Sequence, residues 1–411
     1  MDEFFCSVNA PSETSCGDHG TAPSHTQSPR HSVESMPMAF ALDGMEFLAM
    51  AKRRKPSERI LICGNLVMDH VFDVVTYPKE DTGQRALAAR KSLGGHGGSA
   101  ARVLAQLQGA RTHVSLVGTV PTLEDPDTAA AVATFRAEGV DVSLLEEVGG
   151  NSLPTSVILS SLDTGARTMI STRHGVRELA PQHFAGALQR ALAEQEDLGK
   201  LCWCHLECRQ APEVMLQMAE AWRGAESPAS DASVRRPLSL EVAKPSNGTE
   251  SLLPLLRMCD YAFFSQEFIE ASRGELLNGS AAAREGPAVP GASWDWQQHV
   301  ALCCLRALSA RVGSVQTVWV CMWGKLGSFA LDTSSGRDFY EPAVAVEKVV
   351  ESAHAGDTFI AAFIHATSRG ADVGSALCCS SAVAGHKVQQ VGFDHLVNAL
   401  RTVEAAQEAA S

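Results

Sequence analysis

Short apolar runs recur along the chain and alternate with segments of helical periodicity. The runs that read as strands are RILICG (59–64), HVSLVG (113–118), LCWCHLE (201–207), PLSLEV (237–242), YAFFS (261–265), VWVCMWG (318–324) and SFALD (328–332). Helical patterns such as GSAARVLAQLQ (98–108), TAAAVATFRAEG (128–139) and PEVMLQMAEAW (212–222) lie among them. This alternation predicts an α/β fold with a mostly parallel central sheet covered by helices on both faces.

Two stretches depart from the alternation. Residues 71–92 and 156–170 each read as consecutive short strands without an intervening helix. We expect them to form a small antiparallel flap that projects from the main sheet and serves as a lid.

The rest of the chain divides by composition. Residues 1–57 are expected to be a disordered tail, rich in Ser, Pro and Gly, with a short helix near 36–50, and residues 58–411 to be one domain. The polar, Pro- and Gly-containing stretches 222–237 and 273–293 read as surface insertions.

Composition favours a soluble enzyme. The 411 residues are 45% hydrophobic and carry a net charge of −13, which argues against a nucleic-acid partner held by phosphate contacts. We expect no membrane segment, because acidic residues interrupt the most apolar candidate stretch, 36–51. Twelve cysteines without a disulfide-like spacing and a polar, acidic N-terminus predict a cytoplasmic protein.

Two glycine-rich segments lead directly into helical patterns, LGGHGGSAARVL (93–104) and HAGDTFIAAFI (354–364). Unpaired amides at a helix start stabilise an anion, and small residues let that anion approach closely. Asp357 would then lie beside a bound phosphate, where it could accept a proton from an attacking hydroxyl. The alternative is an ordinary helix cap, worth about 1 kcal/mol.

In their order along the chain, several motifs resemble the ketohexokinase branch of the PfkB (ribokinase-like) sugar kinases. The resemblance covers about 58–396 and rests on ILICGNLVMDHVFDVVTYPKED (60–81), LGGHGGSAARVLAQLQGA (93–110), VVESAHAGDTFIAAF (349–363) and AVAGHKVQQVGFD (382–394). It implies a ribokinase-like fold with a small β-sheet lid. It also implies ATP- and Mg²⁺-dependent phosphorylation of a small, fructose-like sugar.

The resemblance assigns roles residue by residue. It implies that Asp357 is the catalytic base, that Ala355 and Gly356 form a backbone anion hole, and that Arg167 is a cation near the phosphates. The residues that it places around the sugar are Asp69, Asp81, Gly95, His96 and Ser99. Those that it places around the nucleotide are Gly324, Lys325, Leu326, Gly327 and Val388.

Three residues within these motifs depart from the family's pattern. His96 and Ser99 stand where ketohexokinases have sugar-binding asparagines, and His354 stands where the motif begins with glycine. If position 354 needs a positive φ, a histidine there costs about 1 to 3 kcal/mol. The stretch 263–268 lacks the NxxE that many PfkB kinases use to organise magnesium, so the metal ligands stay unassigned, with Glu241 and Glu267 as candidate outer-shell carboxylates.

Three functional hypotheses follow. The first is a kinase for a ketohexose-like sugar, and the second is a kinase for another sugar or a nucleoside. The third, motivated by the three departures, is a catalytically weak PfkB-like binding or regulatory protein. Because the edges of a small flap need covering, and because the family pairs lids between subunits, we also expect a homodimer through the lid.

Overall fold

The computed structural model describes residues 56–410, except for 151, 165–166, 226–234, 245–247, 279–295 and 314. The predicted tail, 1–57, therefore lies outside the described residues apart from its last two positions. Much of both predicted insertions is outside them as well. The described part of the first begins within helix α6 (Pro212–Gly224), and that of the second begins within α8 (Gln266–Leu277).

A mostly parallel sheet forms the centre, as the alternating pattern predicts. Its order is β14-β13-β12-β11-β10-β9-β1-β4-β5, with β6 paired to β4. The strands from β12 through β5 pair in parallel, whereas β13 pairs antiparallel with both of its neighbours, β12 and β14. The strands are β1 (Glu58–Cys63), β4 (Thr112–Val120), β5 (Val140–Asp141), β6 (Leu145–Glu147), β9 (Lys200–Glu207), β10 (Leu238–Val242), β11 (Tyr261–Ser265), β12 (Val318–Met322), β13 (Ser328–Asp332) and β14 (Arg337–Glu341).

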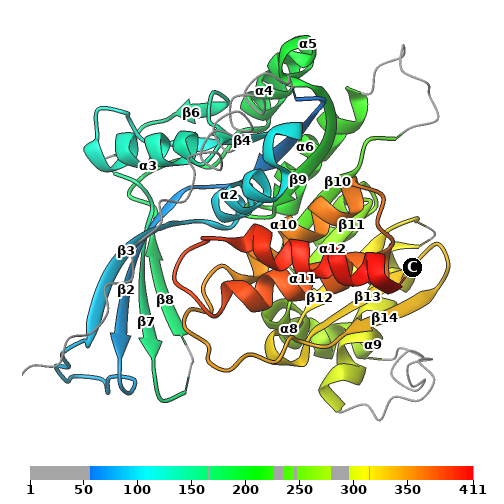
Figure 1. Ribbon diagram of the computed structural model, residues 1–411. Helices are drawn as coiled ribbons and strands as arrows, with labels where there is room; N and C mark the ends of the chain where they lie inside the picture. The colour runs from blue at the N-terminus through cyan, green and yellow to red at the C-terminus, as the bar shows by residue number, and fades with distance from the viewer. Residues whose placement is uncertain are drawn as a thin grey trace, which may run out of the picture. The chain divides into compact units, whose positions relative to one another are not determined.

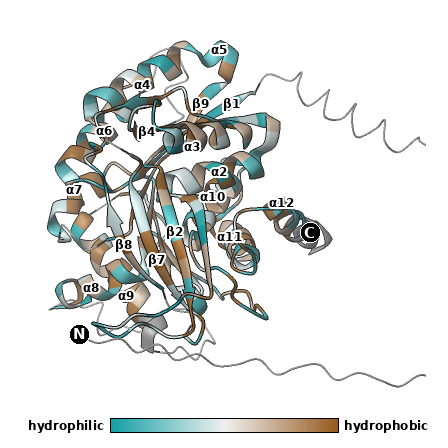
Figure 2. Ribbon diagram, turned by 90° about the vertical axis from the view of Figure 1, so that its left-hand side faces the viewer, coloured by the Kyte–Doolittle hydropathy of each residue, from teal (hydrophilic) through white to brown (hydrophobic). Residues whose placement is uncertain are grey.

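Helices cover both faces of this sheet (Figures 1 and 2). One face packs against α4 (Pro181–Ala193), α6, α7 (Leu253–Leu256), α8 and α9 (Trp296–Val312). The other packs against α2 (His96–Gln108), α3 (Pro126–Ala137), α10 (Ala355–Ser368), α11 (Val373–Lys387) and α12 (Leu396–Ala410). Short elements complete the fold: α5 (Gln195–Leu198), η1 (Gly109–Arg111), η2 (Glu250–Leu252) and η4 (Gly324–Leu326).

Strand β1 shows why the apolar runs are continuous. Leu61 and Cys63 point into the first helical layer, whereas Ile60 and Ile62 point into the second, and all four are buried. Because successive side chains in a strand point to opposite faces, a strand covered on both sides has no polar face to alternate with.

The predicted lid is a separate sheet of four strands, β2 (Val67–Val74), β3 (Ala88–Gly94), β7 (Thr155–Ser161) and β8 (Arg167–Thr172), seen at the lower left of Figure 1. The expectation that it would be antiparallel is wrong in one respect. The pairs β2/β3 and β7/β8 are antiparallel, but β2 and β7, which join the two hairpins, are parallel. The parallel pair arises because β2 and β7 are far apart in sequence, with β4 and α3 between them, so no hairpin turn constrains them to be antiparallel.

Among the described residues, no helix is long and apolar enough to cross a membrane.

Candidate functional site

Asp357 lies in the first turn of α10, where it is 4% exposed. The helix is capped by His354, which adopts the left-handed conformation with φ 61° and ψ 12°. Asp357 is therefore not the capping residue, so the alternative of an ordinary N-cap is wrong. Ala355 and Gly356 precede it, and their amides belong to the first turn, which has no intrahelical acceptor for them.

The imidazole of His354 lies between two carboxylates. Its Nδ1 is 3.2 Å from Oδ2 of Asp357, and its Nε2 is 3.2 Å from Oδ2 of Asp69, a buried residue of β2. The hydroxyl of Ser99, on α2, is 3.1 Å from the same Nδ1. His354 thus spans the space between the predicted base and a predicted sugar-binding acid.

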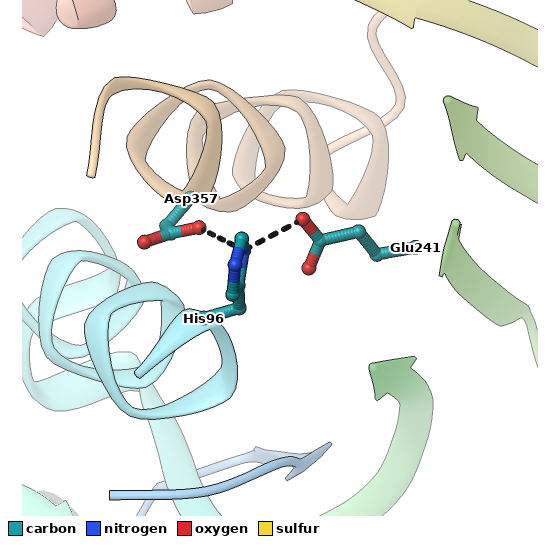
Figure 3. A group of neighbouring side chains, drawn as sticks. All are labelled: His96, Glu241 and Asp357. Carbon is teal, nitrogen blue, oxygen red and sulfur yellow. Dashed lines mark hydrogen bonds and ion pairs between the residues drawn. The ribbon is translucent and has the colours of Figure 1, made fainter. Parts of the chain in front are cut away.

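A second imidazole reaches the other oxygen of the same carboxylate (Figure 3). Nδ1 of His96, at the start of α2, lies 2.9 Å from Oδ1 of Asp357 and 2.9 Å from Oε1 of Glu241. Glu241 lies on β10 and is 4% exposed. All three sequence departures, His96, Ser99 and His354, therefore meet around Asp357.

The charges around Asp357 favour an ionised carboxylate beside protonated imidazoles. Burial acts to raise the pKa of Asp357, but the positive charge of His96 and hydrogen bonds from His354 and His96 outweigh it and lower the pKa. The negative charge of Glu241 holds the pKa of His96 well above its usual range. Burial lowers the pKa of His354, yet its bonds to Asp357 and Asp69 raise it overall. Burial raises the pKa of Glu241.

Glu207, at the end of β9, forms hydrogen bonds that connect the loop after β1 to the start of α2. Its Oε2 accepts hydrogen bonds from the amides of Asn65, at 3.3 Å, and Gly97, at 3.0 Å. Its Oε1 accepts one from Arg209 at 2.9 Å. Sequence reasoning missed this role, although an acidic residue at the carboxyl end of an apolar strand is a usable signal.

Two glycines before α2 lack the Cβ that would block close packing of neighbouring groups against the backbone. A side chain on Gly94 would lie 2.0 Å from Oδ2 of Asp69, so the missing Cβ lets that carboxylate reach the site. The predicted Gly95 has φ 94°, and its missing Cβ would meet the backbone oxygen of Asn65 at 2.2 Å. Gly95 therefore faces the β1 loop, and Gly94, which sequence reasoning missed, is the one packed against Asp69.

The two lid residues predicted for the site are exposed. Arg167 begins β8, and among the described residues no hydrogen bond or ion pair holds it. Burial lowers the pKa of Lys387 on α11, and the charge of Arg167 makes a small contribution in the same direction. Asp81 has φ 59° in the loop between β2 and β3. No measured contact joins Asp81 to Asp357 among the described side chains.

The residues predicted for the nucleotide lie in two segments, η4 with Gly327 after β12 and Val388 after α11. Gly324, Lys325 and Leu326 form η4 after β12, and Gly327 follows with φ 96°. Met322, at the end of β12, lies 4.0 Å from the position that a Cβ on Gly356 would take. The carbonyl of Val388 accepts hydrogen bonds from the amides of residues 350 and 351, just before α10.

A partly buried network of ion pairs connects the lid to this region, and sequence reasoning missed it. Nζ of Lys387 lies 2.8 Å from Oε2 of Glu351, whose Oε1 is 3.1 Å from Arg90 of β3. Arg90 also pairs with Asp73 of β2 at 2.6 Å. The base of the lid is thereby attached to the segment that leads into α10.

Within the described part of the chain, one group of side chains has metal-ligating geometry, namely His96, Glu241 and Asp357, whose ligand atoms lie within 4.8 Å of one another. Glu267, the other acid considered for a metal, is not in that group.

Comparison with known proteins identifies the family of the chain. The model of the family described as pfkB family carbohydrate kinase matches residues 57–398. The chain belongs to the PfkB family. It is accordingly an ATP-dependent phosphotransferase of the carbohydrate-kinase type. The sugar-kinase resemblance of its motifs is confirmed at the level of the family.

Individual relatives support the family and the fold. Mouse ketohexokinase is 30% identical over 342 residues, which cover 83% of this chain and 99% of the relative. Giardia lamblia ribokinase has a TM-score of 0.64 at 17% identity, covering 86% of this chain and all of that one. Cryptococcus neoformans ribokinase, solved in complex with ADP, has a TM-score of 0.61 at 18% identity, covering 85% and 100% of the two chains. The ribokinase-like fold with its small lid sheet is therefore confirmed.

Proposed function

We propose that the protein phosphorylates a hydroxyl of a small, ketohexose-like sugar, with Asp357 as the general base. The observation that carries this proposal is a buried carboxylate in the first turn of α10, beside unpaired backbone amides and separated from Asp69 by the imidazole of His354. A helix start of this kind stabilises phosphate oxygens, and an adjacent carboxylate can receive the proton of the attacking hydroxyl.

In the proposed reaction the sugar oxygen bonds to the γ-phosphorus of ATP as the bond to ADP breaks. The hydroxyl proton passes to Asp357. The amides of Ala355 and Gly356, together with Arg167 of the lid, stabilise the charge on the transferring phosphoryl group. Arg167 suits this role because it is exposed and its charge already acts at Lys387, beside α10.

Asp69 would orient the sugar, because its buried carboxylate is separated from Asp357 only by the imidazole of His354. We assign Gly95, His96 and Ser99 to the same pocket, since His96 and Ser99 contact the groups that hold Asp357. Asp81 would join from the lid loop, which requires movement of the loop or a lid from a second subunit. The turn Gly324–Gly327 and Val388 would hold the nucleotide.

Mg²⁺ enters the proposal with the nucleotide, whose phosphate oxygens are the ligands this ion prefers. We assign no residue of the chain to it. The group formed by His96, Glu241 and Asp357 does not fit Mg²⁺ well, because a nitrogen atom lies between its two carboxylates.

A catalytically weak protein is the second candidate, and one observation favours it. His354 occupies the gap between Asp69 and Asp357, which an acceptor hydroxyl would need to enter. If the imidazole stays there, sugar or nucleotide can bind at the edges of the site without phosphoryl transfer.

A substrate panel separates the candidates. ADP release would be measured with Mg·ATP and a series of ketoses, aldoses and nucleosides, with Asp357→Ala as the matched control. A kinase gives substrate-dependent ADP release that the control lacks. Ligand-induced thermal shifts without ADP release above the control would favour the weak binder, and the preferred member of the panel would decide between a ketohexose, another sugar and a nucleoside.

We also propose that the lid mediates a homodimer. Apolar side chains are exposed on β7 and β8, including Val157 at 39%, Met169 at 46% and Ile170 at 69%, on the sheet that faces the viewer in Figure 2. Exposed strand edges and apolar side chains favour pairing with another copy. Light scattering should give twice the chain mass, and Ile170→Lys should lower it. A monomer at high concentration would contradict this proposal.

A cytoplasmic location is proposed from the cysteines, because the described ones are free thiols. Cell fractionation against a cytosolic marker would test it.

A further inference from the structure

Three potential ligand atoms converge from three elements that are distant in sequence (Figure 3). They are Nδ1 of His96 on α2, Oε1 of Glu241 on β10 and Oδ1 of Asp357 on α10. The nitrogen is 2.9 Å from each of the two oxygens. Separations of about 3 Å between donors are those expected around an ion bound at roughly 2.0 to 2.2 Å from each.

The negative charges of the two carboxylates in this group have few hydrogen-bond donors facing them. Glu241 has a side chain 5% exposed, and His96 is its one hydrogen-bond partner among the described side chains. The same Nδ1 must also serve Asp357, yet an imidazole nitrogen carries at most one proton. Arg209, two residues after the end of β9, pairs with Glu207 and Glu178 instead. The two carboxylate oxygens that face Nδ1 of His96 thus share one proton, whereas the other oxygen of Asp357 lies beside His354. A divalent cation would serve all three ligand atoms at once.

The donor set selects the class of ion. One imidazole nitrogen with two carboxylate oxygens suits Zn²⁺ and neighbouring first-row transition metals, whereas Mg²⁺ favours oxygen ligands alone. Three protein ligands leave a coordination position for water. The His96 side chain is 37% exposed, so an ion can enter from solvent.

We propose that His96, Glu241 and Asp357 form a binding site for a divalent transition-metal ion of the Zn²⁺ class. On binding, Nδ1 of His96 releases its proton to solvent and the metal takes the place of that proton between the carboxylates. The ion engages the Asp357 oxygen directly. Resting on the proposed function, this engagement inhibits phosphoryl transfer, because the lone pair that would receive the hydroxyl proton is coordinated.

Metal binding can be measured without substrate. The metal-stripped full-length protein is titrated with Co²⁺, followed by its visible absorption bands, and then with Zn²⁺ to displace it. Wild type is expected to bind one ion per chain, and His96→Asn and Glu241→Gln are each expected to weaken binding by at least about 100-fold. The matched control is His113→Asn, which removes a histidine 3.2 Å from Asp141, away from the group.

Thermal melts establish that each variant is folded, and two independent variants guard against one that is not. Equal affinity in wild type and both variants would mean adventitious binding and would overturn the proposal, as would an absence of binding to wild type. Inhibition of the kinase reaction by the metal is tested in a separate experiment. Stoichiometric Zn²⁺ should lower kcat of wild type and spare the residual activity of His96→Asn. Metal binding in a protein without activity on any substrate would refute the proposed function and leave the metal site intact.

Discussion

His354 and His365 lie near opposite ends of α10 and are both largely withdrawn from solvent, yet their pKa values shift in opposite directions. Burial and the positive charge of Arg369 lower the pKa of His365 to about 3. Burial acts in the same sense on His354, but the carboxylates of Asp357 and Asp69 reverse it. Both ring nitrogens of His365 lack a hydrogen-bond partner among the described residues. His354, by contrast, lies 3.2 Å from a carboxylate oxygen on each side, although only its Nδ1 is within hydrogen-bonding geometry.

The difference shows what the carboxylates at the start of α10 do. A buried histidine alone becomes neutral, because desolvation disfavours the charged form. At the start of α10 the acids raise the pKa values of two imidazoles, and those imidazoles in turn lower the pKa of Asp357. We therefore interpret the N-terminal end as the functional end and the C-terminal end as packing.

The largest effect is expected from removing the carboxylate that distinguishes the two ends. Asp357→Asn keeps the shape of the side chain and removes the base, so we expect kcat to fall by about 10³-fold. Steady-state ADP release measures it. His365→Asn, at the other end of the same helix, is the control and should leave kcat within a few-fold of wild type. A similar loss in both variants would remove the distinction between the ends.

The next effect is a pH dependence of stability from neutral buried histidines. Burial lowers the pKa of His205 to about 4, as it does that of His365. Both pKa values are below the unfolded value near 6.5, so the unfolded chain binds more protons as the pH falls. Their contribution to stability is complete above about pH 6.5 and is lost toward about pH 4 for His205 and about pH 3 for His365, at up to about 1.4 kcal/mol per pH unit for each histidine.

Urea unfolding at a series of pH values measures this slope. His365→Leu removes one of the two titrating groups and should flatten the slope between about pH 6.5 and pH 4. An unchanged slope would contradict the assignment of a neutral, buried His365.

A smaller effect is expected from removing the imidazole between the acids. His354→Gly accommodates φ 61° and frees the gap between Asp69 and Asp357, so kcat/KM should rise by about 10-fold, equivalent to about 1.4 kcal/mol. His354→Ala opens the same gap but keeps the strained backbone, and most of the gain should persist. A fall in kcat/KM for both variants would instead make His354 part of the catalytic machinery.

The smallest effect concerns stability near neutral pH. His365→Leu should stabilise the fold by about 1 kcal/mol, because it removes two buried nitrogen atoms that lack partners. His205→Leu is the matched contrast, since Nδ1 of His205 lies 2.9 Å from Oγ of Ser239 and its loss takes a partner from a buried hydroxyl. The urea midpoints of unfolding of the two variants are compared at neutral pH. Stabilisation by both substitutions would show that the hydrogen bond between His205 and Ser239 contributes nothing to stability.

The central strands of the main sheet were predictable from the sequence, whereas strands at its edges were not. β1, β9 and β10 are buried on both faces, so their apolar runs are unmistakable. β14 (RDFYE) was not predicted, because it is a half-exposed edge strand with no clear alternation and is defined by its pairing with β13. The two-residue β5 is too short to leave any pattern.

The site could be predicted residue by residue but not as an arrangement. Asp357, His96 and Ser99 were identified from motifs, yet nothing local indicates that His96 and Ser99 would meet His354 and Asp357 across more than 250 residues of chain. Gly94 was overlooked beside Gly95, because the approach of Asp69 to it is made by strand pairing in the lid. Contacts of this kind are set by the packing of α2 against α10, which the sequence pattern does not encode locally.

The most direct test of the central claim is to identify the product by mass spectrometry after incubation with Mg·ATP and the best member of the substrate panel. The account predicts a substrate that gains one phosphoryl group with wild type and, at matched protein concentration and time, about 10³-fold less product with Asp357→Asn. Equal product from both proteins, or none from wild type with any sugar or nucleoside, would contradict it.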